Sequence, residues 1–135
     1  MKNYILVLIL VLLTSCSIEN DTINSFYLEI LPVESAELPS EFTLGEIYEI
    51  QVSYIKPSSC HIFNDFVYEI DDNERTIAVV NTVYVNENCT NTSETTTASF
   101  MFYVSSQGTY VFKFYQGQNE EGIDQYYIVE VPVVE

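Results

Sequence analysis

Apolar residues are distributed along the chain in two different ways. The segment 4–13 is apolar without interruption, whereas from Phe26 onward apolar and polar residues alternate with a period of two. In the segment 48–54, for example, tyrosine and aliphatic residues alternate with Glu, Gln and Ser. Such alternation is typical of strands that bury one face, and no later run of ten or more residues has helical periodicity. The pattern therefore predicts an all-β fold.

Residues typical of turns separate the alternating segments into seven strands. Seven short strands without helices predict two packed sheets, so we expect residues 26–135 to form a seven-stranded antiparallel sandwich. If the strands run up and down in order, the loops 56–61, 86–94 and 116–122 meet at one end. The strands are expected close to residues 26–30, 47–55, 62–70, 75–85, 98–104, 110–115 and 127–133.

One of these strands carries a more specific pattern. The segment 108–114 (Gly-Thr-Tyr-Val-Phe-Lys-Phe) resembles strand F of immunoglobulin-like domains, in which a turn with glycine precedes a tyrosine whose hydroxyl bonds back to the turn. The resemblance implies an immunoglobulin-like sandwich and gives that role to Tyr110. The chain departs from the family in two respects. It has no Trp for the core, and Cys60 and Cys89 fall in predicted loops rather than in two core strands.

The uninterrupted apolar segment is typical of a targeting signal. Ten helical residues rise about 15 Å, roughly half of the ~30 Å hydrocarbon core, so the segment is too short to span a bilayer. A basic start, a short apolar stretch and small residues after it describe a secretory signal. The four residues Leu13-Thr14-Ser15-Cys16 resemble the lipobox of bacterial lipoproteins. The alternative is an ordinary secretory signal followed by an accidental cysteine.

In the lipoprotein family, the peptide bond before the cysteine is cut and the cysteine is acylated. The resemblance therefore implies a cleaved signal peptide at residues 1–15, lipid on Cys16 and a lipidated tether at residues 16–25. The partner is then a lipid bilayer, and the location is the outer membrane of a bacterial envelope, facing the periplasm or the cell surface. Acidic residues soon after the cysteine resemble the export signal of Bacteroidota surface lipoproteins, and Asp21-Thr22-Ile23 resembles the O-glycosylation triplet of that phylum.

Composition narrows the class of partner. The 135 residues carry 4 Lys+Arg against 20 Asp+Glu, a net charge of −16, and 47% of them are hydrophobic. This length allows one domain, and the apolar fraction predicts a folded core rather than a disordered acidic tail. So acidic a chain has little with which to neutralise a row of phosphates, which argues against nucleic acid as a partner.

The chain has three cysteines. With Cys16 assigned to lipid by the lipobox, Cys60 and Cys89 remain, and outside the cytoplasm such a pair usually oxidises to a disulfide. The alternative is a metal site built from Cys60, His61 and Cys89, but zinc needs a fourth ligand and the chain has no second histidine. We therefore expect a disulfide, no metal site and no cofactor.

The candidate binding residues lie in the loops expected at the shared end. They are Lys56, Ser58, His61, Glu120 and Glu121. No catalytic set is expected, because no nucleophile motif surrounds the serines near the single histidine.

Together these features predict a non-catalytic, membrane-anchored envelope lipoprotein that serves as a binding or structural accessory module, with an envelope protein or a glycan as its partner. One alternative is a carbohydrate-binding surface lipoprotein that uses tyrosines near residues 115 or 126. The 11 tyrosines favour stacking on sugars, while the lack of Trp counts against it. Another alternative is a peptidase inhibitor, because the stretch 56–59 (Lys-Pro-Ser-Ser) resembles an inhibitory loop of chagasin-like proteins in position, although not in sequence.

Overall fold

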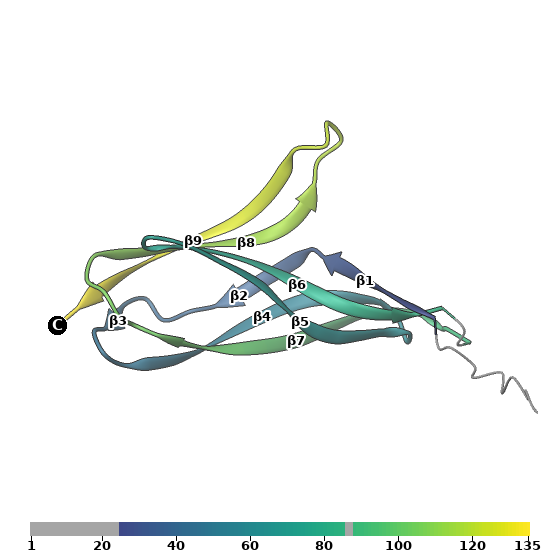
Figure 1. Ribbon diagram of the computed structural model, residues 1–135, viewed down its shortest axis with the longest axis horizontal. Coiled ribbons are helices and arrows are strands. Elements are labelled where there is room, and N and C mark those ends of the chain that lie inside the picture. The colour runs from purple at the N-terminus through teal and green to yellow at the C-terminus, as the bar shows by residue number, and fades with distance from the viewer. Residues whose placement is uncertain (1–24, 86–87) are drawn as a thin grey trace, which may run out of the picture.

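A computed structural model describes residues 25–85 and 88–135 of the chain (Figure 1). The predicted signal peptide, Cys16 and the triplet 21–23 lie outside the described residues, as do the acidic residues of the proposed export signal. Within the described ranges, every element of regular secondary structure is a β-strand. The nine strands are β1 (Phe26–Leu31), β2 (Val33–Glu37), β3 (Phe42–Thr43), β4 (Ile47–Ser58), β5 (His61–Asp71), β6 (Glu74–Tyr84), β7 (Asn91–Tyr103), β8 (Thr109–Gln118) and β9 (Asp124–Val134).

The strands form two sheets whose inner faces share one core. The larger sheet has six strands in the order β1-β6-β8-β9-β3, with β5 also paired to β6, and the smaller sheet has three strands in the order β2-β4-β7. This layered arrangement confirms the predicted all-β, sandwich-like architecture. The core residues are Leu31, Val33, Phe42, Ile50, Val52, Tyr54, Ile77, Val79, Phe102, Val104, Tyr110, Phe112, Phe114 and Val131.

The predicted number of seven strands is wrong, because the described residues contain nine. The alternation pattern misses β2, whose only buried residue is Val33, and it misses β3, which is two residues long. Leu31 pairs with β6 and Val33 pairs with β4, so the chain changes sheets at Pro32. Proline has no N–H to give to either ladder, which suits it to this crossing point.

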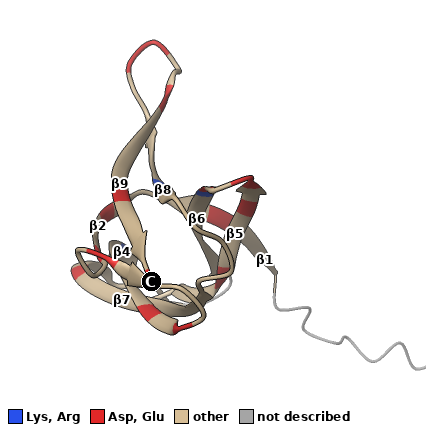
Figure 2. Cartoon of the chain, turned by 90° about the vertical axis from the view of Figure 1, so that its left-hand side faces the viewer, with Lys and Arg blue, Asp and Glu red and all other residues tan. Residues whose placement is uncertain are grey.

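The predicted antiparallel pairing is also wrong for two strand pairs. β6 runs parallel to β8, and β3 runs parallel to β9. β5 follows one edge of β6, and the other edge is shared by β8 beside residues 74–77 and by β1 beside residues 79–84. Beyond Phe114, β8 pairs only with β9, and the two strands continue as the hairpin arm, residues 115–126. Figures 1 and 2 show this arm standing out from the body.

Tyr110 holds the turn that precedes β8. Its side chain is fully buried, and its hydroxyl accepts a hydrogen bond from the main-chain N–H of Ser106 at 3.0 Å. This is the contact that the segment 108–114 predicts. The same turn requires glycine, because Gly108 has a φ of 99° and a Cβ there would lie 3.1 Å from the Asn73 side chain.

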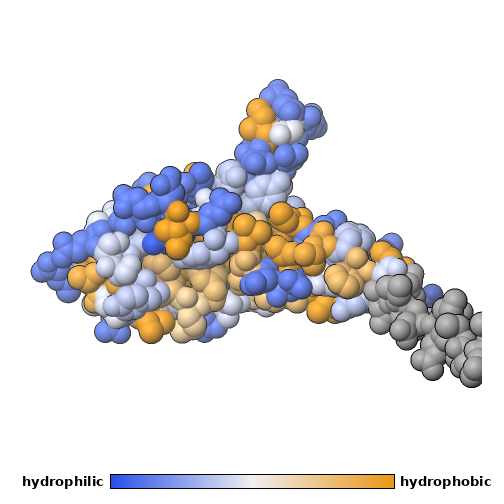
Figure 3. Space-filling model, in the orientation of Figure 1, coloured by the Kyte–Doolittle hydropathy of each residue, from blue (hydrophilic) through white to orange (hydrophobic). Residues whose placement is uncertain are grey.

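The apolar face of β1 points away from the core. Phe26, Leu28 and Ile30 are 60%, 58% and 49% exposed, whereas Leu31 on the opposite face is buried. Figure 3 shows further apolar residues at the surface of the body below the hairpin arm. The inner face of β1 instead brings Glu29 toward the other strands, where it takes part in the site described next.

Candidate functional site

The end of the body at which β1 begins carries the predicted disulfide. Cys60 lies in the tight turn between β4 and β5 and is bonded to Cys89, with their Cα atoms 5.4 Å apart. Main-chain hydrogen bonds from Ser59 to Thr90 and from Tyr84 to Cys60 hold the same segments together. The disulfide is therefore confirmed, and the segments that carry its two cysteines meet at one end.

Most of the predicted loop 56–61 is strand. Lys56 and Ser58 belong to β4 and pair with β7, and His61 is the first residue of β5. Pro57 is tolerated because it sits where the register of β4 and β7 shifts, so its missing N–H leaves no ladder bond open. In the stretch 56–59, which resembles an inhibitory loop in position, all residues but Ser59 are thus part of a sheet.

A hydrogen-bonded chain of three side chains lies beside the disulfide. Ser58 Oγ is 2.7 Å from His61 Nδ1, and His61 Nε2 is 2.7 Å from Glu29 Oε2. The network is satisfied when the Ser58 hydroxyl donates to Nδ1 and Nε2–H donates to the carboxylate, and this tautomer is assigned from the network. Sequence analysis singles out Ser58 and His61 but misses Glu29, which β1 supplies from 32 positions earlier in the chain.

The order of these groups resembles a catalytic triad, but their surroundings suit a structural link. Ser58 and His61 are 8% and 7% exposed, so a substrate would not reach the hydroxyl. The nearest main-chain donors are occupied, since Ser59 N–H donates to Thr90 O at 3.0 Å and Cys60 N–H donates to Ser58 Oγ at 3.2 Å. An oxyanion would therefore find no free donor pair here. The hydrogen bonds tie β1 to the turn that connects β4 with β5.

Glu120 and Glu121 lie at the tip of the hairpin arm. The side chain of Asn119 accepts hydrogen bonds from the N–H groups of Glu121 and Ile123, both at 3.0 Å, which closes the turn. Figures 1 and 2 show this tip well apart from the end at which β1 begins. The structure thus does not bring the two glutamates together with the candidate residues of β4 and β5, contrary to the expected meeting of three loops.

A pocket of about 240 Å³ lies where the hairpin arm leaves the larger sheet. The rings of Tyr115 and Tyr126 meet edge to face at 5.9 Å on its wall, and Asp124 and Glu69 also line it. Burial, together with the nearby Asp124 and Tyr126, raises the pKa of Tyr115. The pocket therefore combines aromatic surface, a protonated hydroxyl and carboxylate acceptors.

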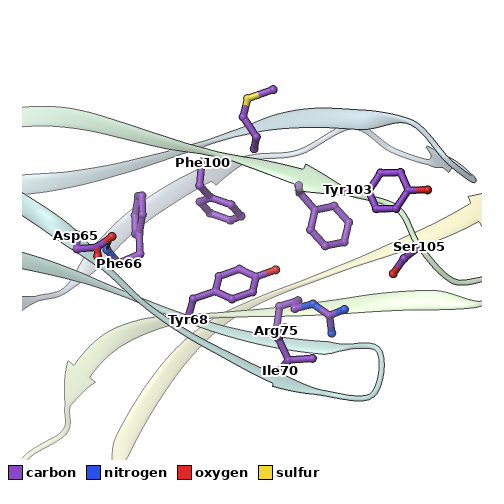
Figure 4. A pocket seen from close by; sticks show the side chains of 10 residues that line it. Asp65, Phe66, Tyr68, Ile70, Arg75, Phe100, Tyr103 and Ser105 are labelled. Atoms are coloured by element: carbon purple, nitrogen blue, oxygen red, sulfur yellow. Dashed lines mark hydrogen bonds between the residues drawn. The ribbon is translucent and has the colours of Figure 1, made fainter.

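A larger cleft of about 410 Å³ opens between the two sheets (Figure 4). It lies where β5, paired only with β6 among the described strands, faces β7, paired only with β4. Aromatic rings pack edge to face along its wall, with Phe66 5.3 Å and Tyr68 5.6 Å from the ring of Phe100. Two charged side chains, Arg75 and Asp65, also line the cleft.

Arg75 is the buried cation of this cleft, with 7% of the residue exposed. Its Nη1 donates hydrogen bonds to the main-chain oxygens of Asp72 at 2.6 Å and Glu74 at 2.8 Å. Its guanidinium carbon lies 5.1 Å from the centre of the Tyr110 ring and 5.9 Å from that of Phe102. Sequence analysis misses this residue, although the alternation of β6 places it on the same face as buried aliphatic residues.

Acidic residues are spread over the strands, the turns and the tip of the arm (Figure 2). Residues 25–85 and 88–135 contain no group of three or more His, Cys, Asp or Glu that could hold a metal ion. In the same ranges, no helix has the length and apolar character needed to cross a membrane.

Comparisons with known proteins identify no protein that is similar to this chain. No family model matches the chain, and neither a curated protein nor a solved structure matches it. The function has to be inferred from the residues of this chain.

Proposed function

We propose that the protein is a non-catalytic lipoprotein of the bacterial envelope, in which an immunoglobulin-like domain serves as a binding or structural accessory module. The observation that carries the proposal is the bond between Cys60 and Cys89. A disulfide is typical of a chain that folds in an oxidising compartment, and this one uses two of the three cysteines. The remaining cysteine, Cys16, stands where the lipobox resemblance expects the acylated residue.

The lipid and the charge of the domain have opposite effects on its distance from the membrane. Each buried methylene contributes ~0.8 kcal/mol, so several acyl chains on Cys16 give durable attachment without a transmembrane helix. Cleavage after residue 15 removes Lys2 and leaves 3 basic against 20 acidic residues, a net charge of −17. Such a body is repelled by anionic headgroups. The lipid thus retains the domain while its charge keeps it off the surface.

The immunoglobulin-like assignment is supported by Tyr110, whose hydroxyl bonds back to the turn before its strand as in that family. The smaller sheet, with β4 between β2 and β7, also fits one layer of such a sandwich. The parallel pairing of β6 with β8 is a departure from a purely antiparallel sandwich. The proposed relation therefore concerns the layered architecture and the tyrosine rather than the full strand order.

Metabolic labelling with a palmitate analogue tests the anchor. We expect the full chain, expressed in a bacterium, to take up the label and to accumulate unprocessed under globomycin, which inhibits the lipoprotein signal peptidase. Cys16→Ala should abolish the label, whereas the matched control Cys60→Ala/Cys89→Ala should keep it. Label that persists in the Cys16 variant, or normal maturation under the drug, overturns the proposal.

A second candidate function is carbohydrate binding, which the pocket at the base of the hairpin arm favours. Tyr115 and Tyr126 offer aromatic surface for a sugar ring, and Asp124 offers acceptor oxygens for its hydroxyls. We expect hits on a glycan array that Tyr115→Ala loses and that Tyr103→Ala, which removes an exposed tyrosine elsewhere, retains. An array without hits, or equal loss in both variants, rules this function out.

A further inference from the structure

Arg75 is a buried cation whose charge the protein balances only in part. Both of its main-chain hydrogen bonds are made by Nη1, its guanidinium lies beside the rings of Tyr110 and Phe102, and the Tyr68 hydroxyl is a further, uncharged partner. The two ion pairs of the described residues join other side chains, so Nε and Nη2 meet no carboxylate there. A guanidinium has five N–H donors, and a buried charge without a counter-charge is destabilising. A carboxylate bound in the cleft would supply this counter-charge.

The cleft beside Arg75 can hold such a ligand. Its volume of about 410 Å³ falls in the range of small-molecule sites, roughly 300–1,000 Å³. Phe66 and Phe100 give it apolar walls, and Figure 4 shows the Tyr68 hydroxyl turned toward the same part of the cleft as the Arg75 guanidinium. Burial raises the pKa of Tyr68, although Arg75 nearby lowers it in part, so the hydroxyl stays protonated and able to donate.

We propose that this cleft binds a carboxylate that is attached to an apolar, preferably aromatic, group. The carboxylate accepts paired N–H bonds from Arg75, the arrangement in which a guanidinium holds a carboxylate best, and a further bond from Tyr68. The apolar group packs against the rings of Phe66 and Phe100, which line the cleft. Because the chain has a net charge of −16, its surface repels anions elsewhere, and binding is confined to this cleft. This proposal does not depend on the lipid anchor.

Equilibrium dialysis with matched pairs of small molecules tests the proposal. The full chain, purified in detergent, is dialysed against 3-phenylpropanoate and against the uncharged 3-phenylpropanamide, with detergent micelles alone as the blank. We expect the acid to bind at least about tenfold more tightly than the amide, because only the acid provides a counter-charge. A second pair, N-acetylglycylphenylalanine and its C-terminal amide, distinguishes the sources of the carboxylate. Tighter binding of this peptide acid assigns the ligand to a peptide C-terminus, and tighter binding of 3-phenylpropanoate assigns it to a free acid.

Variants of the cleft locate the binding. Tyr68→Phe removes one donor and keeps the ring, so acid binding should weaken about three- to tenfold while amide binding stays the same. Tyr27→Phe is the matched control, because Tyr27 is an exposed tyrosine of β1 that does not line the cleft. Arg75→Lys keeps the charge but loses the paired donors, so the preference for the acid should fall below about threefold. If a thermal melt shows that Arg75→Lys does not fold, the comparison of the two tyrosine variants still tests whether the carboxylate binds in this cleft. Equal binding of acid and amide by the wild type, or equal effects of Tyr68→Phe and Tyr27→Phe, overturns the proposal.

Discussion

Removal of the disulfide measures how much stability comes from the cross-link between the β4–β5 turn and the segment before β7. Cys60 and Cys89 are 29 positions apart in the sequence. In the chain-entropy model, closing a loop of about 30 residues lowers the entropy of the unfolded chain by about 12 cal/mol/K, or about 3.6 kcal/mol at 25 °C. Since a domain of this size is stable by only about 5–15 kcal/mol, the loss would be a large part of the total.

The folded state keeps most of its other contacts when the bond is absent. Ser59 N–H donates to Thr90 O at 3.0 Å, and Thr90 N–H donates to Ser59 Oγ at 2.9 Å, so the two segments remain hydrogen-bonded. The effect should therefore arise almost entirely in the unfolded chain. For this reason we expect the variant to keep the native fold while unfolding at a lower denaturant concentration.

Urea denaturation of the full chain in mild detergent, followed by tyrosine fluorescence, provides the measurement. Cys60→Ala/Cys89→Ala should lower the free energy of unfolding by about 3–4 kcal/mol relative to the wild type. Cys16→Ala, which removes a cysteine outside the described residues, is the control and should leave that free energy unchanged. A loss below about 1 kcal/mol for the double variant would refute the entropic reasoning.

The same assay checks three further changes. Gly108→Ala places a side chain at a φ of 99° and 3.1 Å from a neighbouring side chain, so it should cost about 1–3 kcal/mol. Gly122→Ala, which also has positive φ but open space around it, should cost less. Phe112→Ala empties a fully buried site and should cost about 3–5 kcal/mol, whereas Ile128→Ala, at a residue 55% exposed, should cost under about 0.5 kcal/mol. Glu29→Ala removes the acceptor of the buried histidine and should cost about 1–3 kcal/mol, while Glu29→Gln, which keeps an acceptor, should cost less. Equal losses within any of these three pairs would contradict the corresponding argument.

The alternation of apolar residues predicts the central strands well and the first strand poorly. Ile50, Val52 and Tyr54 alternate in sequence and are all buried in β4. In β1 the same pattern identifies a strand, but its more apolar face is the exposed one. A period of two shows that the two faces of a strand differ, yet only the packing of the sheets decides which face is covered. Leu31 is the one residue of β1 that reaches the core.

A strand that is rich in polar residues and pairs with a distant part of the chain is difficult to predict from the sequence pattern. β7 begins at Asn91, although residues up to 94 are predicted to be loop, because Asn, Ser and Thr are typical of turns. Threonine is also β-branched, and Thr95, Thr96 and Thr97 pair with β4 across about 40 positions of sequence. The parallel pairs β6–β8 and β3–β9 likewise join segments that are not consecutive. Local pattern carries no information on such contacts.

The sequence pattern does not reveal the cleft, although one residue of β6 points to it. Arg75 lies two positions before Ile77 and four before Val79, and all three residues are buried on the same face of β6. A charged residue in that place is costly to bury without a counter-charge, so it marks either a carboxylate partner in the fold or a ligand. The acidic turn at Glu120 and Glu121 needs no counter-charge, because its carboxylates are exposed to water. In a chain with 4 basic residues, an arginine on a buried face is therefore a stronger sign of a binding site than any cluster of exposed acids.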